Sequence, residues 1–268
     1  MTKVIVPWKP QPDISKWNIN GPIWFVGEGN MQLLDNKTVR DLASANPGAA
    51  RIFEKFGIDY CCGGEKSLAQ ACSAAKVNLR EVAEALEKPQ PQSGERDWQK
   101  ATLAELTKHI VEKHHGYVRQ EIQRLIPLSA KVVGVHGKNH PELEQIQSSF
   151  QALAEELTMH LMKEERMLFP YIEQLEIAGN SGSRPAAPMF GKVQNPVRMM
   201  MMEHDSAGEL LRKMRRITND YALPEDACMS FKMLYRALQE FETDLHQHIH
   251  LENNILFPRA VELEAQAA

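Results

Sequence analysis

The sequence predicts an all-α protein in which a small helical N-terminal domain precedes an antiparallel four-helix bundle. Between residues 97 and 264, apolar residues recur at alternating spacings of three and four along four long segments, as in helices that pack side by side. Stretches rich in glycine, asparagine and proline, such as residues 179–185, separate these segments. Hydrophobic residues form 43% of the 268-residue chain, which is enough for a substantial core.

The ends of the bundle helices, which we place within residues 97–264, have recognisable signals. The first helix begins at the capping box Thr102-Leu-Ala-Glu105, and we expect Pro127 to end it because proline disrupts a helix interior. The second follows Pro141, a residue favoured in the first turn, and the third follows Pro196. The fourth follows the turn at residues 219–224.

Upstream of the bundle, residues 36–88 predict a small helical domain that contains the motif Asp59-Tyr-Cys-Cys-Gly-Gly64. It begins at a capping-box-like Thr38-Val-Arg-Asp41. Residues 89–96 have the composition of a linker. Residues 1–35 form a tryptophan- and proline-rich extension, either a hairpin about Asn20-Gly21 or an extended arm that packs its tryptophans on the body.

Charge and cysteine content narrow the class of protein. The net charge of −4 gives no basic field to attract phosphates, so we expect no nucleic-acid partner. No apolar run is long enough to span a membrane, and the first residues lack the apolar core of a signal peptide. The four cysteines are too few for a disulfide scaffold. These features favour a cytoplasmic protein.

The strongest functional signal is a set of ionisable residues on the apolar stripes. A buried carboxylate without a partner costs several kcal/mol, so two carboxylates among four imidazoles predict a pair of bound metal ions. The set repeats: His-x3-Glu followed by Leu-Phe-Pro occurs twice, with an offset of 248 − 160 = 88 residues. The predicted ligands are His114, His160, Glu164, His204, His248 and Glu252.

The other histidines, and the acids next to the predicted ligands, are not predicted to bind metal. A single core histidine is more often structural than a ligand, and we assign no metal to His109, His115, His136 and His140. His246 and His250 lie two positions off the stripe, so we place them on the surface or behind the ligands. Glu203 and Glu165 flank ligands in sequence and could hydrogen-bond a ligand imidazole.

The donor set favours iron, with manganese and zinc as alternatives. Imidazoles and carboxylates in a 4:2 ratio, without thiolate, suit iron in a bundle interior. The expected cofactor is two iron ions, bridged by the carboxylates and an oxo group, with open positions for NO or O2. A histidine-rich set suits diatomic ligands better than iron storage.

Cys61 and Cys62 are the second signal. Adjacent cysteines rarely form a relaxed disulfide, and Gly63-Gly64 leaves their backbone accessible. They predict either a thiol site for metal capture, nitrosylation or partner exchange, or two small residues buried at a helix–turn junction. We expect structural roles for Cys72 and Cys228.

These motifs together resemble those of the repair-of-iron-centres family (the YtfE/ScdA type). The Cys-Cys-Gly-Gly motif in a short helical domain, followed by two His-x3-Glu-x3-Leu-Phe-Pro segments, carries the resemblance over residues 36 to 264. The resemblance implies a hemerythrin-like di-iron bundle after an ScdA-N-type domain. It also implies a role in the stress response, the repair of iron–sulfur clusters damaged by nitrosative or oxidative stress, and iron on the same six residues. Residues 1 to about 30 depart from the family pattern.

We therefore expect an iron-donating repair protein more than a classical enzyme. Its partners would be damaged iron–sulfur proteins and an electron donor, with the thiol pair accepting iron or docking the target. The alternatives are nitric oxide reduction at the di-iron site and a hemerythrin-like module that binds or senses O2 or NO. Whether the chain is a monomer or a dimer stays open, as does the role of residues 1–35.

Overall fold

The computed structural model describes residues 37–46, 48–88, 96–183 and 185–267. The extension 1–35, including the hairpin expected about Asn20-Gly21, and the linker 89–96 except Arg96 lie outside the described residues. Within the described ranges the regular structure is helical, apart from a single bridge between Thr38 and Ser67. The prediction of an all-α protein is confirmed.

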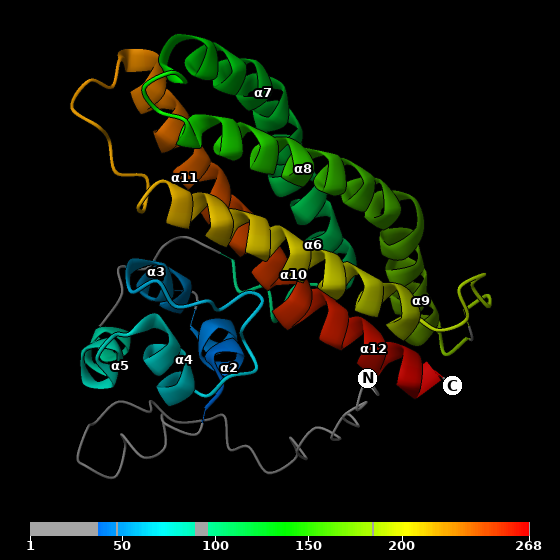
Figure 1. The fold of residues 1–268 in the computed structure, drawn as a ribbon. Helices are drawn as coiled ribbons and strands as arrows, with labels where there is room; N and C mark the ends of the chain where they lie inside the picture. The colour runs from blue at the N-terminus through cyan, green and yellow to red at the C-terminus, as the bar shows by residue number, and fades with distance from the viewer. Residues whose placement is uncertain (1–36, 47, 89–95, 184, 268) are drawn as a thin grey trace, which may run out of the picture.

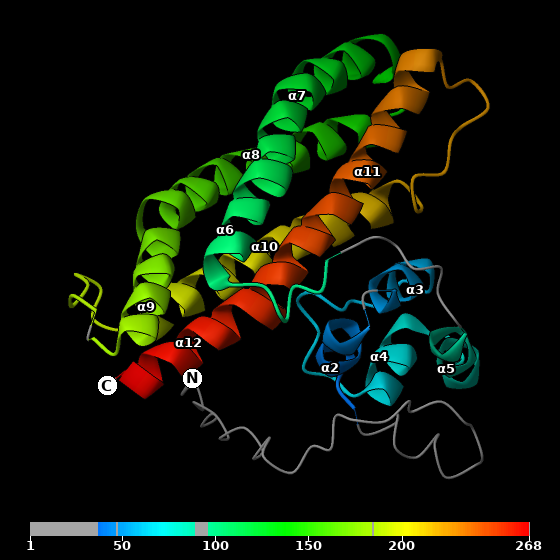
Figure 2. The same ribbon diagram turned by 180° about the vertical axis from the view of Figure 1, so that it is seen from behind.

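Four long helices form the bundle (Figures 1 and 2). Three of them are interrupted by a π-helical turn, named η2, η3 and η4, which leaves the helix continuous. In chain order they are α6 (Leu103–His109), η2 (Ile110–His115) and α7 (Gly116–His136); α8 (Glu142–Lys163), η3 (Glu164–Leu168) and α9 (Phe169–Ser181); α10 (Gln194–Ile217); and α11 (Met229–Leu251), η4 (Glu252–Leu256) and α12 (Phe257–Ala267).

The first bundle helix starts where the sequence indicates but extends further. Thr102 and Glu105 form the expected capping box, with Glu105 N donating to Thr102 Oγ1 at 3.1 Å. Pro127 was expected to end this helix, and that prediction is wrong, because α7 continues to His136. Leu125 and Val132 on either side of Pro127 are buried in the same apolar cluster. Burying two such side chains contributes about 1.5–3 kcal/mol each, which offsets the roughly 3 kcal/mol cost of an interior proline.

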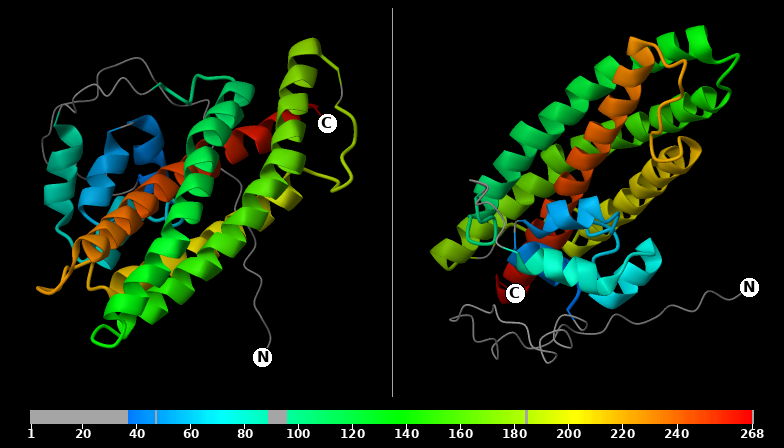
Figure 3. Two further views of the ribbon diagram at one scale, coloured as in Figure 1. Left: turned by 90° about the horizontal axis from the view of Figure 1, so that it is seen from above. Right: turned by 90° about the vertical axis from the view of Figure 1, so that its left-hand side faces the viewer.

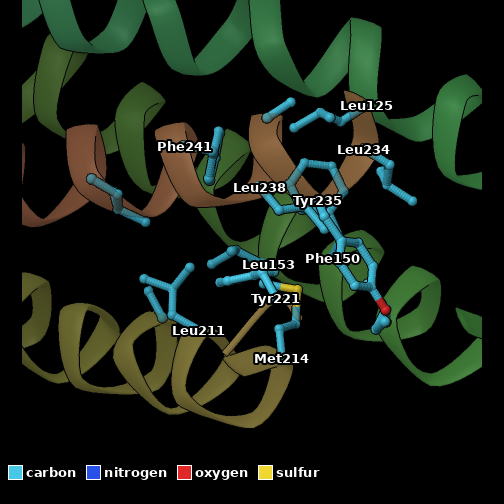
Figure 4. Close-up of a cluster of buried hydrophobic side chains, with 14 of the residues drawn as sticks. Leu125, Phe150, Leu153, Leu211, Met214, Tyr221, Leu234, Tyr235, Leu238 and Phe241 are labelled. Atoms are coloured by element: carbon cyan, nitrogen blue, oxygen red, sulfur yellow. The ribbon is translucent and has the colours of Figure 1, made fainter. Parts of the chain in front are cut away.

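The bundle interior is divided into two apolar clusters. One fills the half around α7, α8, the second half of α10 and most of α11. There, Phe150 and Phe241 meet edge to face with ring centroids 5.4 Å apart (Figure 4). The other fills the half around α6, α9 and α12 and includes Ile110, Ile172 and Leu256. The ionisable residues predicted as ligands lie along the helices between these two clusters.

The N-terminal domain packs four short helices around its own core. These are α2 (Val39–Ala45), α3 (Ala49–Lys55), α4 (Leu68–Ala75) and α5 (Leu79–Glu87). Thr38 and Asp41 form the expected capping box at α2, and Phe53, Tyr60 and Leu68 are among the buried residues of the cluster. The domain lies against the side of the bundle formed by α10 and by α11 with η4 (Figure 3).

Polar side chains of η4 and α10 hold this domain in place. Asn254 Nδ2 donates to the carbonyl oxygen of Tyr60 at 3.0 Å, and Asn254 Oδ1 accepts from Arg40 Nε at 2.9 Å. On α10, Arg212 Nη1 pairs with Asp59 Oδ2 at 3.2 Å. Glycine is favoured at position 64, because a Cβ atom there would lie 3.1 Å from the carbonyl oxygen of Tyr60, 3.2 Å from Arg40 Cβ and 3.3 Å from Asn254 Oδ1. The loop with the two cysteines therefore lies directly on the bundle.

His246 and His250 face this interface instead of open solvent. Their rings lie 6.4 and 5.4 Å from the ring of Tyr60, and His250 is buried. The expectation of a surface position is wrong for His250. The helix face that points away from the bundle axis at this level is covered by the N-terminal domain, which the helical period of α11 alone does not reveal.

His250 should make stability fall as the pH is lowered from about 6.5 towards 4. Burial lowers the pKa of His250 to about 4, and its Nδ1 accepts from Asn254 Nδ2 at 2.7 Å. At a pH between these two pKa values, His250 is protonated in the unfolded chain but neutral in the folded chain. The free energy of unfolding therefore falls by up to about 3 kcal/mol. Denaturant unfolding at several pH values should show a steeper loss for wild type than for His250→Gln, which keeps an acceptor but does not titrate. Equal slopes would contradict this assignment.

Candidate metal centre

Five of the six predicted ligands meet in the layer between the two apolar clusters. The structure forms two groups of four donors, and in each group the ligand atoms lie within 4.8 Å of one another. We call them the first half-site (His115, Glu164, His248, Glu252) and the second half-site (His160, Glu164, His204, Glu252). Glu164 and Glu252 belong to both half-sites and are fully buried. The two groups of potential metal donors therefore have both carboxylates in common.

The sixth position is occupied by His115, whereas the sequence prediction placed His114 there. The stripe Leu106, Ile110, His114 assumed a regular step of four, but η2 spans residues 110–115 and a π-helical turn contains one extra residue. The next inward position after Ile110 is therefore 115. His114 is buried one position aside, where its Nδ1 meets Asp244 Oδ1 at 3.0 Å and its ring stacks on that of His248 at 5.7 Å. It also lines a cavity of about 380 Å³ between the domain and the bundle.

All three π-helical turns coincide with this layer. η3 begins at Glu164, η4 begins at Glu252, and η2 ends at His115. A π-helical turn rotates the residues after it relative to those before it. The same effect turns Leu168 into the interior and leaves Met167 52% exposed. The local unwinding thus points the ligands toward one another, in keeping with the frequent use of such turns at functional sites.

The donor atoms need a cation or protons between them. His160 Nε2 and His204 Nε2 are 3.0 Å apart, and His115 Nε2 and His248 Nε2 are 3.2 Å apart. Two imidazole lone pairs repel at this distance unless a proton or a metal lies between them. Both oxygens of Glu164 and Oε2 of Glu252 are buried without a hydrogen bond, although imidazole nitrogens lie 3.1–3.4 Å from the Oε2 atoms of the two glutamates. Oxygen and nitrogen donors with such orphaned atoms fit a pair of metal ions.

The pKa shifts show how the imidazoles and carboxylates of the site balance one another's charge. Burial lowers the pKa of His160, but the charge of Glu164 and hydrogen bonds with Glu164 and Glu203 raise it to about 10. Burial likewise opposes protonation of His115, yet its bonds with Glu164 and Glu252 raise the pKa to about 9. Burial would raise the pKa of Glu252, but the surrounding imidazoles lower it well below its ordinary value. The raised pKa values favour protonated His115 and His160, and metal binding at these imidazoles must displace their protons.

Three of the ligand imidazoles have a hydrogen-bond partner at the ring nitrogen that faces away from the site. Glu203 Oε2 lies 2.8 Å from His160 Nδ1 and also pairs with Lys163. Glu165 Oε1 lies 2.7 Å from His115 Nδ1 and 2.6 Å from Arg119 Nη2. Such partners fix the tautomer and the ring orientation of a metal ligand.

The third partner, Asn253, was missed by the sequence analysis. Its Oδ1 accepts from His204 Nδ1 at 2.9 Å, and its Nδ2 donates to the carbonyl oxygen of Cys61 at 3.1 Å. A signal was available: Asn253 follows Glu252 as Glu165 follows Glu164, with 253 − 165 = 88. The residue after each glutamate ligand bonds the histidine ligand of the preceding helix.

Cys61 and Cys62 lie next to the second half-site. Cys62 Sγ is 3.6 Å from the carbonyl oxygen of His204 and 3.7 Å from Cys61 Sγ. Asp59 Oδ1 accepts from the backbone nitrogens of Cys62 and Gly63 at 2.9 and 3.0 Å. The hydrogen bond with Cys62, followed by burial, raises the pKa of Cys61 well above its ordinary value. Cys62 is partly exposed and lines a surface pocket of about 610 Å³.

The other cysteines are also free thiols. Cys72 is buried in the core of the N-terminal domain. Cys228 is exposed at the start of α11, where its Sγ lies 3.1 Å from His136 Nε2. Both lie away from the donor layer.

Comparison with known proteins places this architecture in a family. Residues 106–260 match the family described as the hemerythrin HHE cation binding domain, and residues 35–90 match ScdA_N, described as a domain of unknown function. The chain is 37% identical over 224 residues to the "Probable iron-sulfur cluster repair protein" of Haemophilus influenzae, which covers 82% of this chain and 95% of that protein.

Relatives from enteric bacteria show the same level of similarity. The chain is 37% identical over 221 residues to the "Iron-sulfur cluster repair protein YtfE" of Escherichia coli O17:K52:H18 and to that of Shigella boydii serotype 4, covering 82% of this chain and 94% of each relative. Both domains and nearly the whole length of these relatives are matched. The chain therefore belongs to the YtfE family of hemerythrin-like iron–sulfur cluster repair proteins.

Proposed function

We propose that this chain repairs damaged iron–sulfur clusters by donating iron from its buried donor layer through the Cys61–Cys62 pair. The relatives are named for iron–sulfur cluster repair. The observation that carries the delivery route is the contact between the thiol pair and a predicted ligand, since Cys62 Sγ lies 3.6 Å from the backbone of His204. A store and an acceptor in contact allow iron to move without passing through solvent.

The proposed store is a pair of iron ions held by both half-sites. Each ion would have two imidazoles of its own and would share Glu164 and Glu252 with the other ion. Iron supplies redox chemistry here, because its two oxidation states differ in the charge that the carboxylates must balance. The ligand set comprises His115, His160, Glu164, His204, His248 and Glu252.

The chain's own imidazoles can keep the site neutral after iron leaves. His115 and His160 take up protons at neutral pH, because their pKa values are raised to about 9 and about 10. These protons offset the two buried carboxylates, whose desolvation would otherwise destabilise the emptied bundle. Emptying of the store is thereby compatible with a folded protein that can be filled again.

The proposed acceptor is the group formed by Asp59, Cys61 and Cys62. Its ligand atoms lie within 4.8 Å of one another, and thiolate with carboxylate is a donor set that binds iron. Cys61 stays protonated until a cation replaces the proton, because its pKa is raised. The pocket beside Cys62 gives a target protein access to this group. All four thiols are free, which suits the reducing cytoplasm that we propose for the protein.

A cluster-repair assay with a nitrosylated iron–sulfur protein tests the proposal. Iron-loaded wild type with a reductant should restore the cluster, whereas a Cys61→Ser, Cys62→Ser variant loaded with the same iron should restore it no faster than free ferrous iron. A His160→Ala protein shown to lack iron serves as the empty control. Equal repair by the empty and the loaded protein would exclude iron donation, and equal repair by the thiol variant would exclude the thiol route.

A further inference from the structure

The two half-sites are related by the internal repeat, and their surroundings differ at one pair of positions. The equivalent ligands are His115 and His204 (204 − 115 = 89), His160 and His248, and Glu164 and Glu252. Their equivalent partners are Glu165, which bonds His115, and Asn253, which bonds His204. A carboxylate in one half of the repeat is thus replaced by an amide in the other.

The replacement changes what the ligand is connected to. Glu165 pairs with Arg119 at the surface of the bundle and accepts hydrogen bonds only, as a carboxylate must. The amide of Asn253 both accepts and donates, so it links His204 Nδ1 to the carbonyl oxygen of Cys61. Within the described part of the chain, His204 is the ligand imidazole whose partner is bonded to the N-terminal domain.

We propose that the two half-sites release iron separately, and that Asn253 is a positioning residue that makes release from the second half-site depend on the state of the thiol pair. This inference rests on the proposed function and names the half-site that acts as the donor. A displacement of the Cys61–Cys62 loop pulls the Cys61 carbonyl away from Asn253. The amide then loses one of its two partners, and the orientation of His204 is no longer fixed. The first half-site keeps its Glu165 and Arg119 support and retains its ion.

The Cys61–Cys62 loop is built so that a group bound at the thiols must displace it. Cys62 Sγ lies 3.6 Å from the His204 carbonyl oxygen, and a Cβ atom at Gly208 would lie 3.4 Å from the same sulfur. Within the loop, Asp59 Oδ1 accepts from two backbone nitrogens, and Asp59 Oδ2 pairs with Arg212 of α10. The face of Cys62 that lies against α10 has no room for an added group, so we expect a bulky adduct on this sulfur to move the loop away from α10.

Iron release to a chelator, followed in the full-length loaded protein, tests this coupling. A Cys228→Ser background confines alkylation by iodoacetamide to Cys62, because Cys61 and Cys72 are buried, and serine is a favoured residue at the start of a helix. The unmodified protein should release its iron in two phases of equal amplitude. Alkylation of Cys62 should speed one phase about 10-fold, the lower end of the effect of losing an outer partner of a metal ligand, and leave the other unchanged.

The variants separate positioning from general damage. Asn253→Asp keeps an acceptor for His204 but cannot donate to Cys61, so alkylation should no longer change either phase. Asn254→Asp, the neighbouring change, removes the bond to Tyr60 but leaves the link from His204 through Asn253 to Cys61 in place, so alkylation should still speed one phase and leave the other unchanged. Asp59→Asn, which removes the charge that pairs the loop with Arg212 on α10, should speed the same phase without alkylation and serves if Asn253→Asp does not fold.

Mössbauer spectra of the iron left after the fast phase give a second readout, in which one of two iron environments should disappear first. A single release phase, an equal response of both phases, or an unaltered response of Asn253→Asp would overturn the coupling. Failure of the cluster-repair assay with normal two-phase release would instead count against the proposed function alone.

Discussion

Glu252→Gln is expected to reduce bound iron from two ions per chain to less than one. Glu252 is fully buried and belongs to both half-sites, so one substitution removes a charged ligand from each ion. Loss of outer partners of metal ligands costs about 10- to 100-fold in affinity, and loss of a shared carboxylate should cost more. Elemental analysis of the purified protein gives the stoichiometry. Because a ligand at 100 times its dissociation constant adds about 2.7 kcal/mol of stability, a chelator should lower the Tm of wild type but not of the variant.

Glu242→Gln provides the matched control for this substitution. Glu242 is also buried on α11, but its oxygens accept from Arg215 Nε at 2.9 Å and from the hydroxyl of Tyr221 at 3.1 Å, away from the donor layer. This variant should lose stability, since the buried carboxylate that accepts from Arg215 and Tyr221 loses its charge, and it should keep the same amount of iron as wild type. A Glu252→Gln protein with two ions would contradict the shared-carboxylate arrangement.

His115→Ala should lose iron from the first half-site, whereas His114→Ala should retain both ions. The two residues are adjacent, both are buried, and both are imidazoles, so the pair controls for size and burial. His115 Nε2 faces His248 Nε2 at 3.2 Å, while His114 only stacks on the His248 ring. Iron content and the electronic spectrum distinguish the variants.

The opposite result, with iron lost from His114→Ala and kept in His115→Ala, would support the regular helical register, in which His114 is the ligand. Partial loss in both variants would indicate that the His114 ring supports His248. In that case the spectrum of the remaining iron in His114→Ala should keep the features of both half-sites.

The apolar stripes and the repeated His-x3-Glu motif were sufficient to predict the bundle and the helices that converge on the donor layer. They were insufficient for the exact register, because the stripe up to Ile110 assumed 3.6 residues per turn and the extra residue of η2 has no sequence signature of its own. The continuation of α7 past Pro127 depends on burial of Leu125 and Val132 in a cluster formed by other helices. Tertiary packing overrides the local preference in that case.

Contacts between the two domains were beyond the sequence. Nothing in the helical period of α11 or η4 shows that Asn253 and Asn254 meet backbone carbonyls 192 and 194 residues upstream. The motif at Cys61–Cys62 predicted a chemical group but not its neighbour. Its position against His204 depends on how one domain lies on the other, which single-helix patterns do not encode.

The division of the bundle interior into two apolar clusters has a consequence for folding cooperativity. A layer of buried charge lies between the cluster at α6, α9 and α12 and the cluster at α7, α8 and α11, so each cluster can form with little help from the other. In the proposed loaded state, ions held by residues of all four helices would join the two halves into one cooperative unit. Without those ions we expect the two halves to open separately. Amide exchange in the two halves should therefore differ between the loaded and the unloaded protein.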